Sequence, residues 1–195
     1  MVAVTVRAGS KAEMALPDGT FVHLNAATNL EYDVNNSKQR LVKLSGEAFF
    51  DVAKNPDCPF KVIINDLQIE VVGTSFNVKT YKKDIVETSL LSGRIRISGG
   101  SLPHEYTLSP GQKATYSAMD RTLRISKADA HVEAGWRDNY LIFESTPLID
   151  VIAQIERWYG VEIRLHHKQI AQDLLSGSFR NESIQNVIRS LSIQY

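Results

Sequence analysis

The stretch LVKLSGEAFFDV, residues 41–52, decides the fold class of this chain. On an extended strand one face takes Val42, Leu44, Ala48, Phe50 and Val52, and the other takes Lys43, Ser45, Glu47 and Asp51. A period of two residues is typical of a half-buried β-strand and gives no apolar stripe on a helix. The stretch therefore predicts β-structure that packs one face on a core.

Turn-forming dipeptides divide the first two thirds of the chain into short segments. They are Asp18-Gly19, Asn35-Asn36, Asn55-Pro56, Asn65-Asp66, Ser92-Gly93, Gly99-Gly100 and Pro110-Gly111. Glycine, proline, asparagine and aspartate favour the backbone conformations that tight turns need. Strands at intervals of about ten residues predict a mainly β domain over residues 1–132, built as an antiparallel sandwich or roll, or as a solenoid.

The pattern changes near Trp136, and residues 136–195 predict a small α+β module. A strand is predicted at residues 140–143. A helix is predicted to follow, with Thr146 as its cap and Pro147 as its first residue. Gly160 is placed to end this helix in the left-handed conformation, and residues 161–165 then alternate like a second strand. The apolar face of the helix consists of Leu148, Val151, Ile152, Ile155, Trp158 and Tyr159.

This module repeats itself at an offset of 36 residues. The second copy predicts a short strand around Gly177-Ser178-Phe179 and a second helix that Asn181 caps. Together the copies predict duplicated β-α-β units. The matching positions are Phe143 and Phe179, Leu148 and Ile184, Val151-Ile152 and Val187-Ile188, Ile155 and Leu191, and Tyr159 and Tyr195.

A counterpart of the strand at residues 161–165 is missing from residues 1–195. Either that strand lies outside these residues or a partner completes the sheet by strand addition, and both can hold together. We therefore expect open strand edges in this module to bind a partner protein. The candidate residues are Val161, Glu162, Ile163, Arg164 and Leu165 on one edge, and Gly177, Ser178, Phe179 and Arg180 on the other.

Composition argues against several classes of function. Lys and Arg number 22 and Asp and Glu also number 22, so a formal charge of zero gives no electrostatic basis for nucleic-acid binding. No stretch approaches the roughly 20 apolar residues that span a bilayer. The single cysteine, Cys58, can form neither an internal disulfide nor a cysteine-rich zinc site, and the histidines include no H-E-x-x-H pair. We expect no cofactor and no metal.

Gly73-Thr74-Ser75-Phe76-Asn77 invites a catalytic interpretation, because it resembles the first half of the G-x-S-x-G nucleophile turn. Asn77 stands where the second glycine should be, and no helical pattern follows. We therefore expect a structural corner, not an enzyme. In this interpretation Phe76 enters the core, Gly73 supplies backbone freedom and the polar side chains bond local amides.

Several short motifs follow one another with a specific order and spacing along residues 1–130. They are Leu16-Pro17-Asp18-Gly19-Thr20; Val22 with Leu24-Asn25; Arg40, Val42, Leu44 and Gly46-Glu47-Ala48 with Phe50 and Val52; Pro59-Phe60 with Val62; Gly73-Thr74 with Phe76-Asn77-Val78; and Leu108 with Pro110-Gly111-Gln112. This series resembles the periplasmic domain of the FecR family of anti-sigma factors. The tail, from Trp136 to Phe179, resembles the module that follows FecR domains in Bacteroidetes members, which is similar to the secretin/TonB short N-terminal domain.

The resemblance implies a regulator. FecR-family proteins are single-pass inner-membrane proteins that relay the state of a TonB-dependent outer-membrane transporter to an extracytoplasmic-function sigma factor. The implied partners are the signalling domain of that transporter and, through a cytoplasmic segment outside these residues, the sigma factor. The resemblance places this chain in the periplasm, as the soluble part of a protein that an N-terminal helix outside these residues anchors.

One alternative from another class is a secreted carbohydrate-binding β module. Such a module is expected to expose a stripe of aromatic side chains on its β face. The aromatic side chains of this chain fall mostly on inward positions, which favours the regulator.

Overall fold

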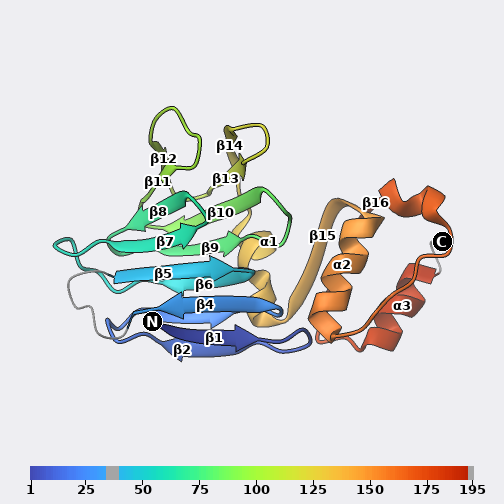
Figure 1. Ribbon diagram of the computed structural model, residues 1–195. Helices are drawn as coiled ribbons and strands as arrows, with labels where there is room; N and C mark the ends of the chain where they lie inside the picture. Colours follow the sequence, from blue (N-terminus) through green and yellow to red (C-terminus); the bar gives the residue numbers. More distant parts are fainter. Residues whose placement is uncertain (34–39, 193–195) are drawn as a thin grey trace.

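The computed structural model describes residues 1–33 and 40–192, and it contains a β-sandwich, a short helical linker and a small α+β module (Figure 1). The predicted turn at Asn35-Asn36 and the repeat position Tyr195 lie outside the described residues. The prediction of a mainly β domain followed by an α+β module is confirmed.

The first sheet of the sandwich has seven strands and mixes two pairing directions. β5 pairs in parallel with β7, and the other neighbours in this sheet are antiparallel. A parallel pair needs a crossover, which here passes through the second sheet. In spatial order the strands are β1 (Val2–Val6), β4 (Thr28–Tyr32), β5 (Arg40–Ser45), β7 (Phe60–Ile64), β8 (Leu67–Val71), β11 (Ile95–Gly99) and β12 (Tyr106–Leu108).

The second sheet also has seven strands and is antiparallel throughout. Its inner face packs on the inner face of the first sheet, and the apolar side chains of both sheets form one core between them. In spatial order its strands are β14 (Thr122–Lys127), β13 (Gln112–Ser117), β10 (Ile85–Ser92), β9 (Ser75–Lys79), β6 (Glu47–Asp51), β3 (Phe21–Leu24) and β2 (Ala12–Ala15).

The stretch 41–52 forms two strands, one in each sheet, and not a single strand. The chain crosses from β5 to β6 at Gly46, where φ is 115° and an added Cβ would lie 2.6 Å from the Cα of Thr28. Both features require glycine at this position. Because the sheets face each other, the alternation still buries Val42 and Phe50 in the same core.

A short linker follows the sandwich and lies on the outer face of the second sheet. It contains helix α1 (Ala130–Ala134), which Asp129 caps by accepting a hydrogen bond from the His131 amide, and the 3-10 helix η1 (Gly135–Asp138). Ala134 and Trp136 are buried against Phe49 of β6. The linker ends at Asn139, which adopts the left-handed conformation.

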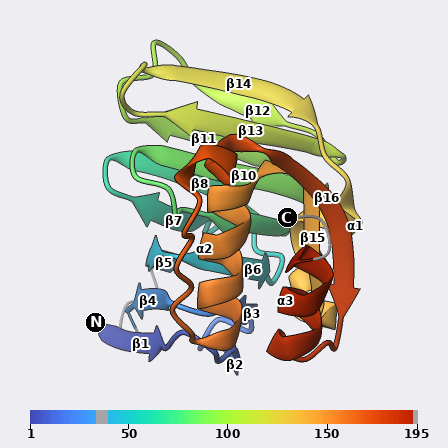
Figure 2. The same cartoon turned by 90° about the vertical axis from the view of Figure 1, so that its right-hand side faces the viewer.

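The C-terminal module, defined here as the described residues 140–192, pairs two strands and packs two helices on them (Figures 1 and 2). β15 (Tyr140–Pro147) and β16 (Leu174–Arg180) are antiparallel, with a bulge between Phe143 and Thr146. The helices are α2 (Leu148–Tyr159) and α3 (Ile184–Ser192), and the short 3-10 helix η2 (Lys168–Gln172) precedes β16. Phe143 and Phe179, which the repeat matches, meet at a ring-centroid distance of 6.3 Å.

The first predicted helix is confirmed, but its N-terminus differs from the prediction. Pro147 is the cap residue and not the first helical residue, and Thr146 bonds the backbone of Glu144 instead of capping the helix. The bulge in β15 turns Thr146 back on its own strand, which explains this difference. The left-handed end at Gly160 is confirmed, with φ 67°.

The predicted cap of the second helix was also wrong. Ser183 accepts a hydrogen bond from the Asn186 amide, so Ser183 and not Asn181 caps α3. Asn181 takes a left-handed conformation, with φ 52°, and its amide donates to the carbonyl of Asn139. Asn181 therefore belongs to the turn that leaves β16.

The strand predicted at residues 161–165 is not formed. Figure 2 shows this segment as a coil beside α2. The alternation was interpreted correctly only in part, because Ile163 and Leu165 pack on the module core whereas Val161 is 37% exposed. The amide of Ile163 donates to the side chain of Glu156 at 2.8 Å, and no described strand lies where it could supply backbone partners. A β-strand forms only when it pairs with a neighbouring strand, so the alternation at residues 161–165 was not sufficient to predict one.

Candidate functional site at the junction of the two domains

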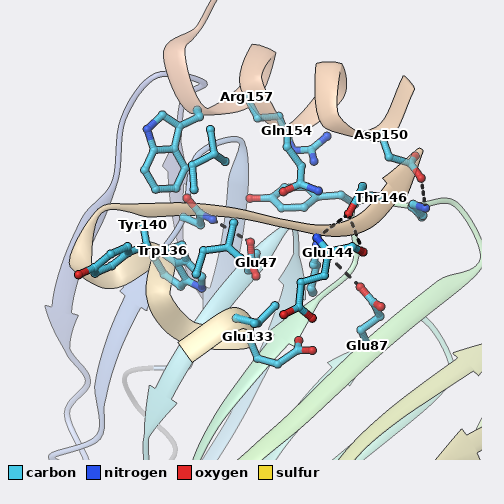
Figure 3. A pocket seen from close by; sticks show the side chains of 18 of the residues that line it. Glu47, Glu87, Glu133, Trp136, Tyr140, Glu144, Thr146, Asp150, Gln154 and Arg157 are labelled. Atoms are coloured by element: carbon cyan, nitrogen blue, oxygen red, sulfur yellow. Dashed lines mark hydrogen bonds and ion pairs between the residues drawn. The ribbon is translucent and has the colours of Figure 1, made fainter. Parts of the chain in front are cut away.

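The linker and the C-terminal module meet the sandwich at a junction that contains a cavity of about 340 Å³. Side chains enter it from all three parts (Figure 3). Glu47 and Glu87 come from the second sheet, Trp136 comes from the linker, and Asp150 and Arg157 come from α2. We take this junction as the candidate functional site.

A buried carboxylate organises the floor of the junction. Glu47 is only 7% exposed, although it lies on the polar face of the stretch 41–52. Its Oε2 accepts a hydrogen bond from the side-chain amide of Asn25 at 2.7 Å, and its Oε1 accepts one from Asn77 at 2.9 Å. Each carboxylate oxygen therefore has a donor, as a buried charge requires.

The same network reaches the linker. The indole Nε1 of Trp136 donates to the Oδ1 of Asn77 at 3.1 Å, across 59 positions of sequence. Asn77 was predicted to bond local amides, and this prediction was wrong, because Asn77 joins Glu47 to Trp136 instead. Asn77, a motif residue of the sandwich, thus positions the linker that precedes the module.

Two cations and two aromatic rings connect the sandwich to the module in a reciprocal way. The Nζ of Lys11 lies 3.6 Å from the ring centroid of Trp158, so the sandwich supplies the cation. The guanidinium of Arg157 lies 4.1 Å from the ring centroid of Tyr81, so here the module supplies it. Such stacks are worth about 0.5–2 kcal/mol each, depending on how far the cation is desolvated.

Lys11 makes further contacts at the junction. Its ammonium donates to the carbonyl of Trp136 at 2.7 Å and to the Oδ1 of Asn139 at 3.0 Å. Burial lowers the pKa of Lys11 to about 8, against the opposite effect of the Glu47 carboxylate. Lys11 therefore joins the linker, the turn at Asn139 and the module.

The groups around the second stack are also perturbed. Burial raises the pKa of the Tyr81 hydroxyl well above its ordinary value, and the charge of Glu47 raises it further. That hydroxyl donates to the carbonyl of Ala26. Burial lowers the pKa of Arg157, while Tyr81 and Glu47 oppose this effect. Glu47 thus lies close enough to act on both cations of the junction.

Among the described residues, the backbones of the two domains are in direct contact at the turn between β1 and β2. The amide of Gly9, in the turn between β1 and β2, donates to the carbonyl of Arg157 at 2.8 Å. A Cβ at Gly9 would lie 3.2 Å from the carbonyl oxygen of Tyr159, and a Cβ at Gly160 would lie 3.2 Å from that of Ala8. Glycine at both positions lets these backbones approach.

Ion pairs surround the cavity. Lys113 lies 2.9 Å from both Glu87 and Glu133, which joins the sandwich to the linker. Burial would raise the pKa of Glu87, but the ammonium groups of Lys79 and Lys113 outweigh it and hold that pKa below its ordinary value. Lys82 and Asp150 form a further bridge between sandwich and module at 2.6 Å. Each of these charges therefore has a partner of opposite sign within the chain.

The residues predicted to bind a partner lie elsewhere, in the module. Gly177, Ser178, Phe179 and Arg180 belong to β16, which pairs with β15 on one side only. Val161, Glu162, Ile163, Arg164 and Leu165 form the coil that lies along α2. The structure therefore brings neither set into the junction, and their binding role stays a prediction.

The segment Gly73–Asn77 forms a corner and the first residues of the strand β9. Phe76 is fully buried in the sandwich core, as predicted. Gly73 is needed for space and not for backbone freedom, because an added Cβ would lie 2.9 Å from the Cα of Lys54. The hydroxyl of Ser75 donates to the Oδ1 of Asp51 at 2.8 Å and that of Thr74 donates to the carbonyl of Arg94, so the prediction that these side chains bond local amides was wrong.

Sequence reasoning missed the junction although one signal was present. Phe49 lies on the polar face of the stretch 41–52, next to Glu47 and Asp51. A large apolar residue on that face indicates that something covers it, and Arg137, Ala134 and Trp136 do so. What covers it could not be identified from the alternation alone.

Residues 1–33 and 40–192 contain no group of three or more His, Cys, Asp and Glu side chains placed to hold a metal ion. None of the described helices has the length and apolarity to cross a membrane. The rings of Phe50, Phe60 and Phe76 are fully buried in the sandwich core. They therefore contribute nothing to the exposed aromatic stripe that a carbohydrate-binding module would need.

The fold and the junction define a mainly β protein whose candidate site is a contact between two domains. Two family models match it: "FecR protein" over residues 2–96 and "FecR, C-terminal" over residues 140–195. The chain therefore belongs to the FecR family of anti-sigma factors, which are signal-relaying regulators.

Solved structures agree with this assignment. A crystal structure of a "putative anti-sigma factor" from Parabacteroides distasonis ATCC 8503 is 30% identical, with a TM-score of 0.90, and the match covers 100% of this chain and 92% of that one. A second crystal structure with the same description is 30% identical, with a TM-score of 0.89, over 99% of this chain and 91% of the other. A search of the curated proteins finds no match.

Proposed function

We propose that this chain is the periplasmic sensing part of a transmembrane anti-sigma factor. In this proposal it relays the state of a TonB-dependent outer-membrane transporter to an extracytoplasmic-function sigma factor. The family assignment and the likeness to the Parabacteroides protein support a regulator of this kind. The proposal assigns no catalytic step and no cofactor to the chain, and it assigns sigma-factor binding to a cytoplasmic segment outside it.

One observation supports partner contact through the C-terminal module. The repeat makes α2 and α3 equivalent, but their apolar faces are covered to different extents. Ile152 in α2 is 8% exposed, whereas its counterpart Ile188 in α3 is 39% exposed. The coil at residues 161–165 packs on the module core next to α2, and no segment among the described residues does the same for α3. This half-open face fits an extended segment of another chain.

We therefore place the partner contact along residues 161–165, along Gly177 to Arg180 of β16, and on the exposed side of α3. An added strand would pair with the free edge of β16 or with the coil, and its apolar side chains would cover Ile188. The proposed occupant is a segment of the transporter's periplasmic signalling domain.

The test is a calorimetric titration of the chain with the purified signalling domain of the transporter encoded beside it. We expect saturable binding, and we expect Ile188→Glu to weaken it at least about tenfold, since the charge cannot be buried against an apolar strand. Met119→Glu, at a side chain that is 79% exposed on the sandwich and lies outside the module, is the matched control and should bind like wild type. Absence of binding by wild type would refute the proposed function; equal binding by both variants would refute the placement.

A further inference from the structure

The contact between the sandwich and the C-terminal module is mostly polar. The module reaches the sandwich through the Lys11 and Arg157 stacks, the Lys82–Asp150 bridge and the Gly9–Arg157 hydrogen bond. Trp158 supplies the apolar contribution, at the edge of the small cluster around Phe49 and Trp136. Polar contacts of this kind are typical of domains that move relative to each other.

The linker is attached more firmly than the module that follows it. Ala134 and Trp136 are buried on Phe49, and the Trp136 indole bonds Asn77. The chain then turns at Asn139, whose left-handed conformation marks the end of η1. A motion of the module can therefore take place at Asn139 while the linker stays in place.

We propose that the two reciprocal cation–aromatic stacks, Lys11 on Trp158 and Arg157 on Tyr81, form a reversible latch that holds the module on the sandwich, and that its release accompanies the signal. This proposal rests on the proposed function for the meaning of the released state. The carboxylate of Glu47, a residue of the Gly46-Glu47-Ala48 motif that Asn25 and Asn77 hold in place, acts electrostatically on both cations of the latch.

The amide of Gly9 reports directly on this latch, because its acceptor is the carbonyl of Arg157 in the other domain. Its hydrogen exchange can be followed by NMR in the whole chain, without any partner. The amide of Val52, which bonds the carbonyl of Thr74 within the sandwich, serves as the internal reference. Exchange of Gly9 through a local opening should be faster than exchange of Val52 through global unfolding.

The variants Lys11→Met and Arg157→Met keep an apolar stem and remove the cation. We expect each to speed the exchange of Gly9 about five- to tenfold, and the double variant more, with Gly9 still exchanging faster than Val52. Arg164→Met is the matched control, since Arg164 belongs to the module, is 80% exposed and pairs only with Glu162 among its described contacts. It should leave both amides as in wild type.

The latch is refuted if Gly9 and Val52 exchange at one common rate in wild type, or if the two cation variants behave like Arg164→Met. Neither result depends on a transporter, so the latch can fail while the proposed function stands. In the presence of the signalling domain we expect the exchange of Gly9 to accelerate. Binding without this acceleration would overturn the link between release and signal.

Discussion

At the scale of single residues, Glu47 shows how a motif residue can serve an interface. The Gly-Glu-Ala segment is part of the alternation that builds the sandwich, yet the Glu47 side chain leaves the core and is buried by the linker and module. Its oxygens accept from Asn25 and Asn77, and Asn77 in turn accepts from Trp136. A carboxylate fits this position because both of its neighbours are amide donors.

Glu47→Gln tests this network. Glutamine offers one acceptor oxygen where the carboxylate offers two, so one amide of Asn25 or Asn77 would face another donor. Neither asparagine can flip freely, because their Oδ1 atoms accept from the Ala26 amide and from the Trp136 indole. We expect the free energy of unfolding to fall by about 1–3 kcal/mol in urea denaturation. Glu162→Gln, on a side chain that is 74% exposed, should change it by less than about 0.5 kcal/mol, and equal losses would contradict the network.

At the scale of elements, the crossover between β5 and β6 determines how the sandwich is built. Gly46 turns the chain from one sheet into the other, directly before Glu47. Its φ of 115° and the nearness of Thr28 both exclude a side chain. The same turn therefore closes the core and directs Glu47 to the junction.

Gly46→Ala should be much more damaging than alanine at another glycine with positive φ. Gly111, with φ 79°, has no atom within 4 Å of an added Cβ, so Gly111→Ala should cost only the backbone strain of about 1–2 kcal/mol. Gly46→Ala adds the steric conflict with Thr28 and should cost several kcal/mol more, or prevent folding. Thermal unfolding of both variants, followed by circular dichroism, makes the comparison. Similar melting temperatures would show that the crossover relaxes.

Sequence patterns predicted the elements that depend on local spacing. The alternation gave strands, and apolar spacing with Gly160 gave α2 from Leu148 to Tyr159. What failed depended on distant residues. The segment 161–165 alternates but has no partner strand within residues 1–33 and 40–192, and Glu47 is buried by residues far along the chain. Of the junction, single residues such as Asn25, Glu47, Asn77, Trp136 and Trp158 stood out in sequence patterns, and nothing in their spacing showed that they meet.

At the scale of the whole molecule, two folded cores are joined by a junction of different character. The sandwich and the module each bury a continuous apolar cluster, whereas the junction contains ion pairs, amide bonds and aromatic stacks around a cavity. The stability of each domain is therefore largely its own. The junction fixes the orientation of the module relative to the sandwich. Because its contacts are ion pairs and cation–aromatic stacks, the docking of the two domains should depend on the charges of these side chains.

The pH dependence of stability should reveal the desolvated ammonium of Lys11. Its pKa is about 8 in the folded chain and 10.5 ordinarily, so between these values the unfolded chain binds more protons. The contribution of Lys11 to stability must then rise as pH increases from about 8 to 10. The measurement is urea unfolding of wild type and Lys11→Met at a series of pH values. The difference between their free energies of unfolding isolates the contribution of Lys11, because the other titrating groups are common to both proteins. A difference that is flat or falls over this interval would contradict the burial of Lys11.

The evolution of the two domains is constrained by the reciprocal arrangement of Lys11, Trp158, Arg157 and Tyr81. The sandwich and the module each contribute one positive charge and one aromatic ring, so neither can be exchanged by recombination without loss of both stacks. Recombination that joined this sandwich to a foreign tail would leave a half-desolvated ammonium and a tyrosine without their counterparts. The two halves should therefore descend together, as a matched pair.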